Sequence, residues 1–192
     1  MVNKKTKNIV LFASGSGTNV ENIVKYFKGD ARLRVGCVFT NKPNAGVIAR
    51  ATKMKIPVKV FDKSQMETGH LLEEIKRLDP DLIILAGFLL KIPIEFTQAF
   101  SDQIINIHPA LLPKYGGKGM YGDRVHRAVK EAGDRETGIT IHYVNEHYDQ
   151  GSIIFQSKTA IEGNESIQEI ADKVHQLEYT HYPAVIKKIL FP

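Results

Sequence analysis

Short apolar runs alternate with segments of helical periodicity through most of the chain, and this pattern constrains the fold more than any other feature. Runs of this length are typical of strands buried on both faces, and the segments between them space apolar residues as amphipathic helices do. Strands that alternate with helices predict a parallel sheet covered by helices. The predicted strands are Asn8–Ala13, Leu33–Thr40, Val58–Phe61, Leu82–Ala86 and Ile104–His108, and the predicted helices are Val20–Phe27, Ala45–Lys53, Leu71–Leu78 and Pro93–Phe100.

The pattern changes after the fifth predicted strand. A long loop at Leu111–Gly122 precedes a helix at Val125–Glu131 and two further strands, Thr137–Val144 and Ser152–Ala160. The link between these two strands is too short for a helical crossover, so we expect antiparallel neighbours. The predicted fold class is therefore a Rossmann-like three-layer α/β/α fold, with a mostly parallel sheet and an antiparallel C-terminal part.

The last helix has a clear start. Ser166 and Glu169 form a capping-box pattern, and the helix is predicted to continue through Leu190. Pro183 lies inside it and is expected to kink or split it, since proline cannot donate the helical hydrogen bond. The chain of 192 residues is long enough for one domain with a substantial core, so residues 1–192 are predicted to be a single domain.

Composition excludes several classes of function. The formal net charge is +5, but the lysines and arginines are scattered, which argues against nucleic-acid binding and favours small anionic ligands. Cys37 is the single cysteine, so no intramolecular disulfide can form. The N-terminal apolar run is too short for a signal peptide or a membrane span, so we predict a cytoplasmic protein without a membrane partner.

The stretch IINIHPALLP at residues 104–113 ends a buried strand at a proline. Because side chains alternate along a strand, Asn106 and His108 are expected to share one face. Pro109 has no N–H to donate, so His108 should lie at the carboxyl edge of the sheet, where open α/β sheets bind ligands. The alternative is a purely structural pair that satisfies backbone groups at the strand end.

The segment SGSGTN at Ser14–Asn19 lies where a helix N-terminus presents unpaired N–H groups. A dinucleotide loop needs a third glycine and an acidic residue about 20 positions later, but Val20 and Thr40-Asn41 fail both requirements. A Walker A loop is excluded because no Lys-Ser/Thr pair follows the glycines. We therefore predict a monophosphate site, and the structural alternative is an ordinary turn with Thr18 or Asn19 capping the helix.

The turn HYDQG at residues 147–151 joins the two late strands and contains Asp149. Taken alone, it fits a turn-forming aspartate. An aspartate close to His108 would also raise the imidazole pKa and hold its ring for proton transfer near neutral pH. No serine or cysteine lies in an elbow motif, so the nucleophile is expected to come from a substrate.

Five motifs, taken in order along nearly the whole chain, resemble the phosphoribosylglycinamide formyltransferases of the folate-dependent formyltransferase superfamily. NIHPALLP followed by an aspartate in a late turn is typical of the superfamily, and the phosphate loop points to this member. The motifs are SGSGTN from residue 14, LAGFLLKI from residue 85, NIHPALLPKY from residue 106, GITIHYV from residue 138 and YDQG from residue 148.

The resemblance implies that Asn106, His108 and Asp149 catalyse formyl transfer from 10-formyltetrahydrofolate, the cosubstrate, to the amine of glycinamide ribonucleotide in de novo purine biosynthesis. Asn106 and a protonated His108 would donate hydrogen bonds to the tetrahedral oxyanion. Asp149 would keep His108 charged and assist removal of the proton from the attacking nitrogen. No metal is expected.

The resemblance also implies the residues that bind glycinamide ribonucleotide. Gly17, Thr18 and Asn19 would hold its phosphate, and Glu178 on the last helix would contact the nucleotide. Without the family, Glu178 fits a solvated helix face equally well. Residues 1–100 would then form a phosphate-binding half of the domain, and residues 101–192 a folate and catalytic half.

The folate would bind, by the same resemblance, against a backbone segment next to Asn106. This segment consists of Leu89, Leu90, Lys91 and Ile92. As plain chemistry it fits an apolar link in the core equally well. His126 and His142 also fall at matching positions, and each fits a hydrogen-bonded neighbour of the site.

Two departures from the family pattern affect the folate end. The family commonly has an arginine near Ser64 that helps to bind the folate tail, and Lys63-Ser64-Gln65 replaces it here. The loop Lys114–Gly122 is longer and richer in glycine than the familiar KYPG form. A mobile lid and a replacement of the missing basic contact by Lys118 are hypotheses for this loop.

Other functions remain open on the sequence alone. A formyltetrahydrofolate hydrolase would use a similar trio with water as the nucleophile. A methionyl-tRNA formyltransferase would need a tRNA-binding domain and a basic face. A metal-dependent hydrolase could use His108, His142 and Asp149, although the spacing matches no metal motif. A non-catalytic nucleotide-binding module would use SGSGTN alone, and the chain is expected to be a monomer or a homodimer.

Overall fold

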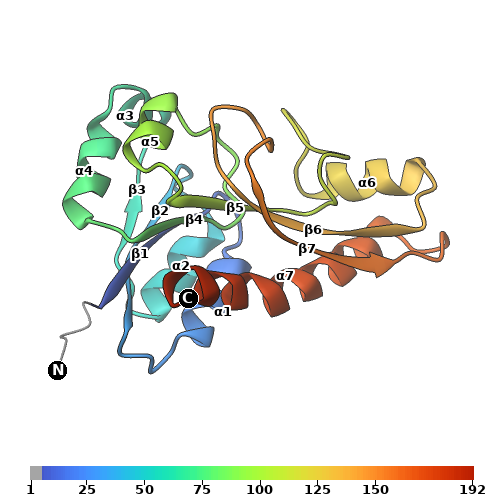
Figure 1. Ribbon diagram of the computed structural model, residues 1–192, viewed down its shortest axis with the longest axis horizontal. Coiled ribbons are helices and arrows are strands. Elements are labelled where there is room, and N and C mark those ends of the chain that lie inside the picture. The colour runs from blue at the N-terminus through green and yellow to red at the C-terminus, as the bar shows by residue number, and fades with distance from the viewer. Residues whose placement is uncertain (1–5) are drawn as a thin grey trace.

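The apolar runs predicted as strands form one seven-stranded sheet in the computed structural model, which describes residues 6–192 (Figure 1). The strands are β1 Lys7–Phe12, β2 Leu33–Thr40, β3 Val58–Val60, β4 Leu82–Leu85, β5 Ile104–His108, β6 Glu136–Tyr143 and β7 Ile153–Ala160. Their order across the sheet is β3-β2-β1-β4-β5-β6-β7. Strands β1 to β5 pair in parallel, whereas β6 is antiparallel to both β5 and β7. The predicted mixed sheet is confirmed.

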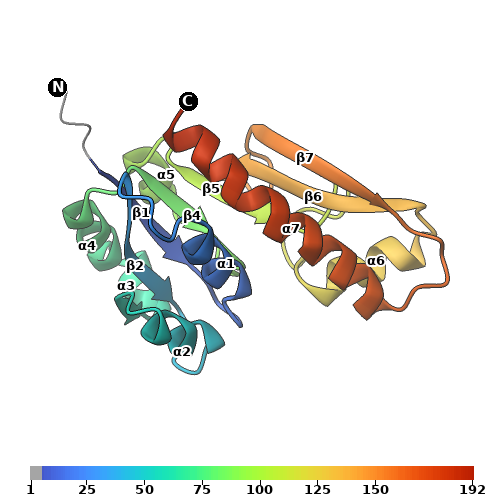
Figure 2. The same cartoon turned by 90° about the horizontal axis from the view of Figure 1, so that it is seen from below.

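Helices cover both faces of the sheet, as the alternating pattern predicts. The helices are α1 Thr18–Tyr26, α2 Gly46–Lys53, α3 Lys63–Glu67, α4 His70–Leu78, α5 Ile94–Ala99, α6 Asp123–Glu131 and α7 Ile167–Leu190. Helices α1, α2 and α7 lie on one face and α3, α4 and α5 on the other, so the fold has three layers (Figure 2). Helix α7 runs along the sheet and also contacts α6 and β6.

Strand β1 shows how the two faces acquire separate cores. Ile9 and Leu11 pack with α1 and α7, while Val10 and Phe12 point to the other face and pack with α4 and α5. All four side chains are fully buried. A strand buried on both faces therefore has a continuous apolar sequence.

The structure corrects two details of the sequence prediction. Helix α3 is missing from the prediction because its five residues are too few to show periodicity, although Asp62 and Gln65 form a capping box there. Helix α7 is continuous and is not split at Pro183. Pro183 cannot donate to the carbonyl of Tyr179, but the side-chain amide of Asn22 on α1 donates to that oxygen at 2.8 Å. A side chain from another element thus replaces the missing helical bond.

The remaining global features agree with the composition. Cys37 is a buried free thiol on β2. Within residues 6–192, no helix combines the length and the hydropathy that crossing a bilayer requires. Because helices cover both faces of the sheet, a ligand can reach the strands only at their ends. Open α/β sheets bind ligands at the carboxyl edge.

Candidate active site

The antiparallel pairing of β5 with β6 brings Asn106 to His142. These two residues are direct partners in the strand register, and Asn106 Nδ2 lies 3.2 Å from His142 Nε2. His142 Nδ1 lies 2.8 Å from the carbonyl oxygen of Tyr143, which can only accept, so Nδ1 carries the proton. His142 Nε2 then accepts a hydrogen bond from the Asn106 amide. This bond orients Asn106 and leaves its second amide hydrogen without a partner among residues 6–192.

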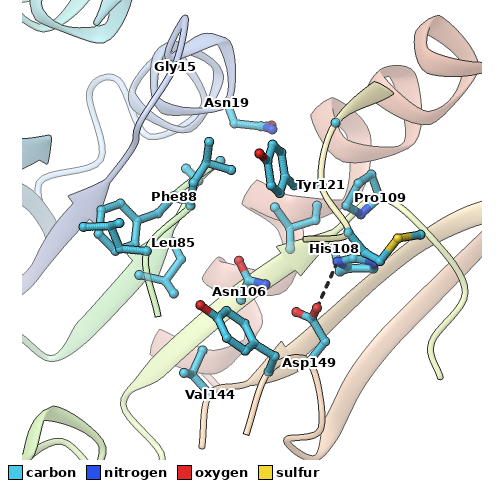
Figure 3. Close-up of a pocket in the computed structure, with 18 of the residues that line it drawn as sticks. Gly15, Asn19, Leu85, Phe88, Asn106, His108, Pro109, Tyr121, Val144 and Asp149 are labelled. Carbon is cyan, nitrogen blue, oxygen red and sulfur yellow. Dashed lines mark ion pairs between the residues drawn. The ribbon is translucent and has the colours of Figure 1, made fainter. Parts of the chain in front are cut away.

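His108 and Asp149 meet at the end of β5. His108 Nδ1 lies 3.6 Å from Asp149 Oδ2, and His142 Nε2 lies 3.6 Å from Asp149 Oδ1 (Figure 3). His108 Nε2 lies 2.8 Å from the carbonyl oxygen of Tyr115, so Nε2 carries the proton in the neutral ring. The lone pair on His108 Nδ1 therefore faces the carboxylate and is the position that can take up a proton.

Burial and nearby charges act on the pKa values of this pair in opposite directions. Burial is the largest effect on His108 and lowers its pKa below 6.5, while the charge of Asp149 raises the pKa by less. Burial therefore opposes the expected effect of Asp149, and the protonation of His108 by Asp149 stays a prediction. Burial by itself raises the pKa of Asp149, but His142, the charge of His108 and the Gly117 N–H together lower it below its ordinary value. Burial thus favours the neutral form of the imidazole, and the surroundings of Asp149 favour its carboxylate form.

Two residues that the sequence did not single out, Gly117 and Thr140, hold the surroundings of this pair in place. The Gly117 N–H donates to Asp149 Oδ2 at 2.9 Å, so the glycine-rich loop binds the carboxylate directly. The buried Thr140 hydroxyl donates to the Ala110 carbonyl at 2.7 Å and accepts from the Leu112 N–H at 3.0 Å. Thr140 is paired with His108 in the β5–β6 register, so it fixes the chain just after the imidazole. The only feature that could have pointed to Thr140 is its position opposite His108 on the adjacent strand.

The segment Ser14–Asn19 connects β1 to α1 and forms the opposite end of the site. Gly17 is the N-cap residue with φ of 78°, and no side chain caps the helix. The first N–H groups of α1 are therefore available to an anion. The Ser14 hydroxyl donates to Asn41 Oδ1 at 2.6 Å and accepts from the Leu89 N–H at 3.0 Å. Ser14 thus ties this loop to the segment that is predicted to bind the folate.

Asn19 bonds to Glu178 instead of capping α1. Its Nδ2 donates to Glu178 Oε2 at 2.8 Å, and both side chains are at least 90% buried. Burial raises the pKa of Glu178, and the Asn19 hydrogen bond and His175 oppose that rise. The alternative of a solvated glutamate is therefore wrong. Asn19 Oδ1 is buried without a partner among the described residues, so it can accept a hydrogen bond from a ligand.

One cavity of about 380 Å³ joins these two ends, and every site residue predicted from the sequence lines it. Figure 3 shows Asn19 above the trio and Phe88, in the segment after β4, to its left. In that segment Leu89 is 38% exposed, while Ile92 is buried. Lys91 Nζ lies 5.9 Å from the centre of the Tyr148 ring, so a cation and an aromatic ring border this end.

The chain matches a known protein family. The model of the formyl transferase family matches residues 7–186. This chain belongs to the formyl transferase family.

Named relatives within the family agree with the motifs. The chain is 40% identical over 192 residues to the chloroplastic phosphoribosylglycinamide formyltransferase of Arabidopsis thaliana, covering 96% of this chain and 66% of that relative. It is 39% identical over 187 residues to the phosphoribosylglycinamide formyltransferase of Haemophilus influenzae, covering 94% and 86% respectively. The crystal structure of glycinamide ribonucleotide transformylase 1 from Geobacillus kaustophilus superimposes with a TM-score of 0.87 at 36% identity, covering 96% of this chain and 99% of that one. The resemblance drawn from the five motifs is confirmed.

Family membership makes this chain a formyltransferase, and the family implies a folate-type formyl donor. Within residues 6–192, no group of three or more histidine, cysteine, aspartate or glutamate side chains has metal-site geometry. Ser64 lies in α3, and neither Ser64 nor the exposed Lys118 lines the cavity. The hypothesis that Lys118 replaces the family arginine therefore has no support from the cavity lining.

His126 and His175 form a further part of the cavity wall. The two rings are 6.4 Å apart, and both line the cavity beside Glu178. His126 is 2% exposed, and its Nδ1 has no partner among the described residues. Burial, followed by His175, lowers the pKa of His126 to about 4. Both positions therefore present polar rings to the end of the cavity that holds Asn19.

Proposed function

We propose that this chain transfers the formyl group of 10-formyltetrahydrofolate to the amine of glycinamide ribonucleotide. The products would be formylglycinamide ribonucleotide and tetrahydrofolate, in de novo purine biosynthesis. The observation that carries the proposal is that Asn106, His108 and Asp149 line one cavity together with an uncapped helix N-terminus and the segment after β4. The names of the relatives support this choice of substrates.

The two ends of the cavity suit two different substrates. Gly17, Thr18 and the α1 N–H groups would bind the nucleotide phosphate, and Glu178 would accept hydrogen bonds from the ribose hydroxyls. Leu89, Leu90, Lys91 and Ile92 would bind the pterin at the other end, next to Asn106. The reacting amine and the formyl carbon would then meet at the trio.

Asn106 would stabilise the charge that develops on the formyl oxygen. Attack by the amine forms the new C–N bond and turns the formyl oxygen into an oxyanion. The Asn106 amide hydrogen that does not bond to His142 would donate to this oxyanion. One donor of this kind lowers the barrier by roughly 3 to 4 kcal/mol.

His108 would move the proton between the two nitrogens. In its neutral form Nδ1 has a free lone pair and would accept the proton of the attacking amine. The resulting imidazolium would lie 3.6 Å from the Asp149 carboxylate, which stabilises its charge. His108 would return the proton to N10 of the folate as the C–N10 bond breaks, so Asp149 assists without itself becoming protonated.

One assay tests the proposal. The protein is incubated with 10-formyltetrahydrofolate, with and without glycinamide ribonucleotide, and tetrahydrofolate and formylated nucleotide are measured. We expect release of tetrahydrofolate that depends on the nucleotide, with one formylated nucleotide for each folate released. Equal release without the nucleotide would instead identify a hydrolase that uses water as the nucleophile.

Treatment with a chelator separates the proposal from the metal-dependent alternative. The proposed steps use only the amide, the imidazole and the carboxylate, so EDTA followed by gel filtration should leave turnover within measurement error. A loss of turnover that is restored by added Zn²⁺ or Mn²⁺ would favour a metal site at His108, His142 and Asp149.

The predictions of a cytoplasmic location, and of a monomer or homodimer, remain part of this proposal.

A further inference from the structure

The glycine-rich loop between β5 and α6 carries one aromatic side chain into the cavity. Tyr121 lines the cavity and is 40% exposed, and its hydroxyl has no hydrogen-bond partner within residues 6–192. Figure 3 shows its ring between Asn19 and Pro109, with the side chain pointing into the cavity. Tyr121 therefore faces the end of the cavity that contains Asn19 and α1. None of the five family motifs contains this residue.

The loop is attached at its base to the catalytic pair. The Tyr115 carbonyl accepts from His108, and the Gly117 N–H donates to Asp149. A turn closed by the bond from the Met120 N–H to the Gly117 carbonyl, 3.1 Å long, leads directly to Tyr121. The position of Tyr121 relative to the trio is thus set by a short, hydrogen-bonded segment.

Arg124 supports the ring from the first turn of α6. Its guanidinium carbon lies 5.0 Å from the centre of the Tyr121 ring, within the range of a cation–π contact. Lys91 is the only lysine or arginine among the described residues that line the cavity, and it borders the folate end beside Tyr148. At the nucleotide end, a dianionic phosphate would therefore meet uncharged donors, the cavity histidines and the Tyr121–Arg124 pair.

We propose that Tyr121, supported by Arg124, binds glycinamide ribonucleotide: its ring packs over the ribose and its hydroxyl donates to the phosphate. This inference rests on the proposed function, because it assumes that the phosphate binds at α1. The nucleotide would then accept a hydrogen bond from the Tyr121 hydroxyl and cover the exposed face of its ring. A tyrosine supplies apolar area and one hydrogen-bond donor in a single side chain with few rotatable bonds.

The test measures binding of the nucleotide and of the folate separately. Tyr121→Phe removes the hydroxyl alone, and a lost hydrogen bond to a phosphate should raise Kd and KM for glycinamide ribonucleotide by about tenfold. Tyr121→Ala also removes the ring and should raise both constants further. Arg124→Met should raise them by about threefold. The KM for 10-formyltetrahydrofolate should stay within twofold of wild type in all three variants.

Tyr26 provides a matched control. It is an exposed tyrosine on α1 with Lys187 Nζ 6.0 Å from its ring centre, and it does not line the cavity. Tyr26→Ala should leave all these constants unchanged. Calorimetric Kd values for glycinamide ribonucleotide give the same information without turnover.

Three outcomes would overturn the inference. The first is a nucleotide Kd within twofold of wild type in both Tyr121 variants, in an enzyme that formylates the nucleotide normally. The second is an equal rise in KM for both substrates in Tyr121→Ala, which would indicate a general role of the loop. The third is a wild-type protein that neither binds nor formylates glycinamide ribonucleotide, which would remove the proposed function as well.

Discussion

The catalytic trio and the phosphate end of the cavity are held in place in different ways. At the catalytic end, Asn106, His108 and Asp149 come from β5 and a distant turn, and their positions depend on contacts with His142 and Gly117. At the phosphate end, the binding groups are neighbours in the chain, because Gly17 and the first turn of α1 follow directly after β1. One end is therefore a tertiary arrangement of side chains, and the other is a local backbone conformation.

This difference explains what each end can do. Side chains that converge from separate strands can hold an amide, an imidazole and a carboxylate within reach of one reacting atom. A helix N-terminus offers fixed N–H groups that bind an anion without a titratable partner. Substitutions at the catalytic end should therefore change turnover, whereas substitutions at the phosphate end should change stability or affinity.

The largest effect is expected at the catalytic end. Asn106→Ala, His108→Ala and Asp149→Asn should each lower kcat by roughly 10²- to 10³-fold, because Asn106 and His108 act on the reacting atoms and Asp149 stabilises the charge on His108. Circular dichroism should show an unchanged fold. The measurement is kcat with both substrates saturating.

Asp134→Asn is the matched control for Asp149→Asn. Asp134 accepts a hydrogen bond from the Tyr115 hydroxyl at 2.9 Å, near the same loop but outside the cavity. Its replacement should leave kcat within a few-fold of wild type. Near-normal turnover of any of the three cavity variants would remove that residue from the mechanism.

The second effect concerns backbone conformation at the phosphate end. Gly17 has φ of 78°, and an added Cβ would lie 2.5 Å from Val47 Cγ2 and 2.7 Å from Val47 Cα. Gly17→Ala should therefore lower the free energy of unfolding by about 2 to 4 kcal/mol. Thermal and urea denaturation measure this loss.

Gly15 is the matched control for Gly17, because it is a glycine of the same loop that does not adopt the left-handed conformation. An added Cβ at Gly15 meets no atom within 4 Å, and its φ lies outside the left-handed region. Gly15→Ala should change the free energy of unfolding by no more than about 0.5 kcal/mol. Equal losses of unfolding free energy in Gly15→Ala and Gly17→Ala would show that the left-handed backbone at Gly17 is not what makes this position sensitive.

The third effect is a pH dependence of stability that arises from His126. Its folded-state pKa of about 4 lies below the ordinary value of 6.5, so between these values the unfolded chain binds a proton that the folded protein does not. Stability should therefore fall as the pH drops from 6.5 to 4, by about 3 kcal/mol at most from this residue. Urea denaturation across this range should show a shallower dependence in His126→Asn. An unchanged slope in His126→Asn would show that burial at this end of the cavity does not suppress protonation.

The smallest effect is expected from Glu178. Glu178→Gln keeps the size of the side chain but weakens an acceptor for the ribose hydroxyls, so KM for glycinamide ribonucleotide should rise about tenfold. KM for the folate and kcat should change little, since Glu178 bonds to Asn19 of the phosphate loop. Asp172→Asn, an exposed change on the same helix, is the control. A fall in kcat with unchanged KM would place Glu178 with the catalytic residues instead.

The sequence predicted much of this architecture because strand and helix periodicity are local. The runs that form β1 to β5, the antiparallel β6–β7 pair and the capping box at Ser166 all follow from neighbouring residues. The two errors in the fold have physical causes of another kind. Helix α3 is too short for a periodic signal, and the continuity of α7 at Pro183 depends on the Asn22 amide of α1.

By itself, the sequence determined which residues lie at the carboxyl edge of the sheet and which loop precedes a helix N-terminus, because both depend on alternation and on prolines and glycines nearby. Only the tertiary structure decided the lowered pKa of His108, the partner of Asn19 and the hold of Gly117 on Asp149. Burial and hydrogen bonding between distant segments set these properties, and no pattern within a single segment encodes them.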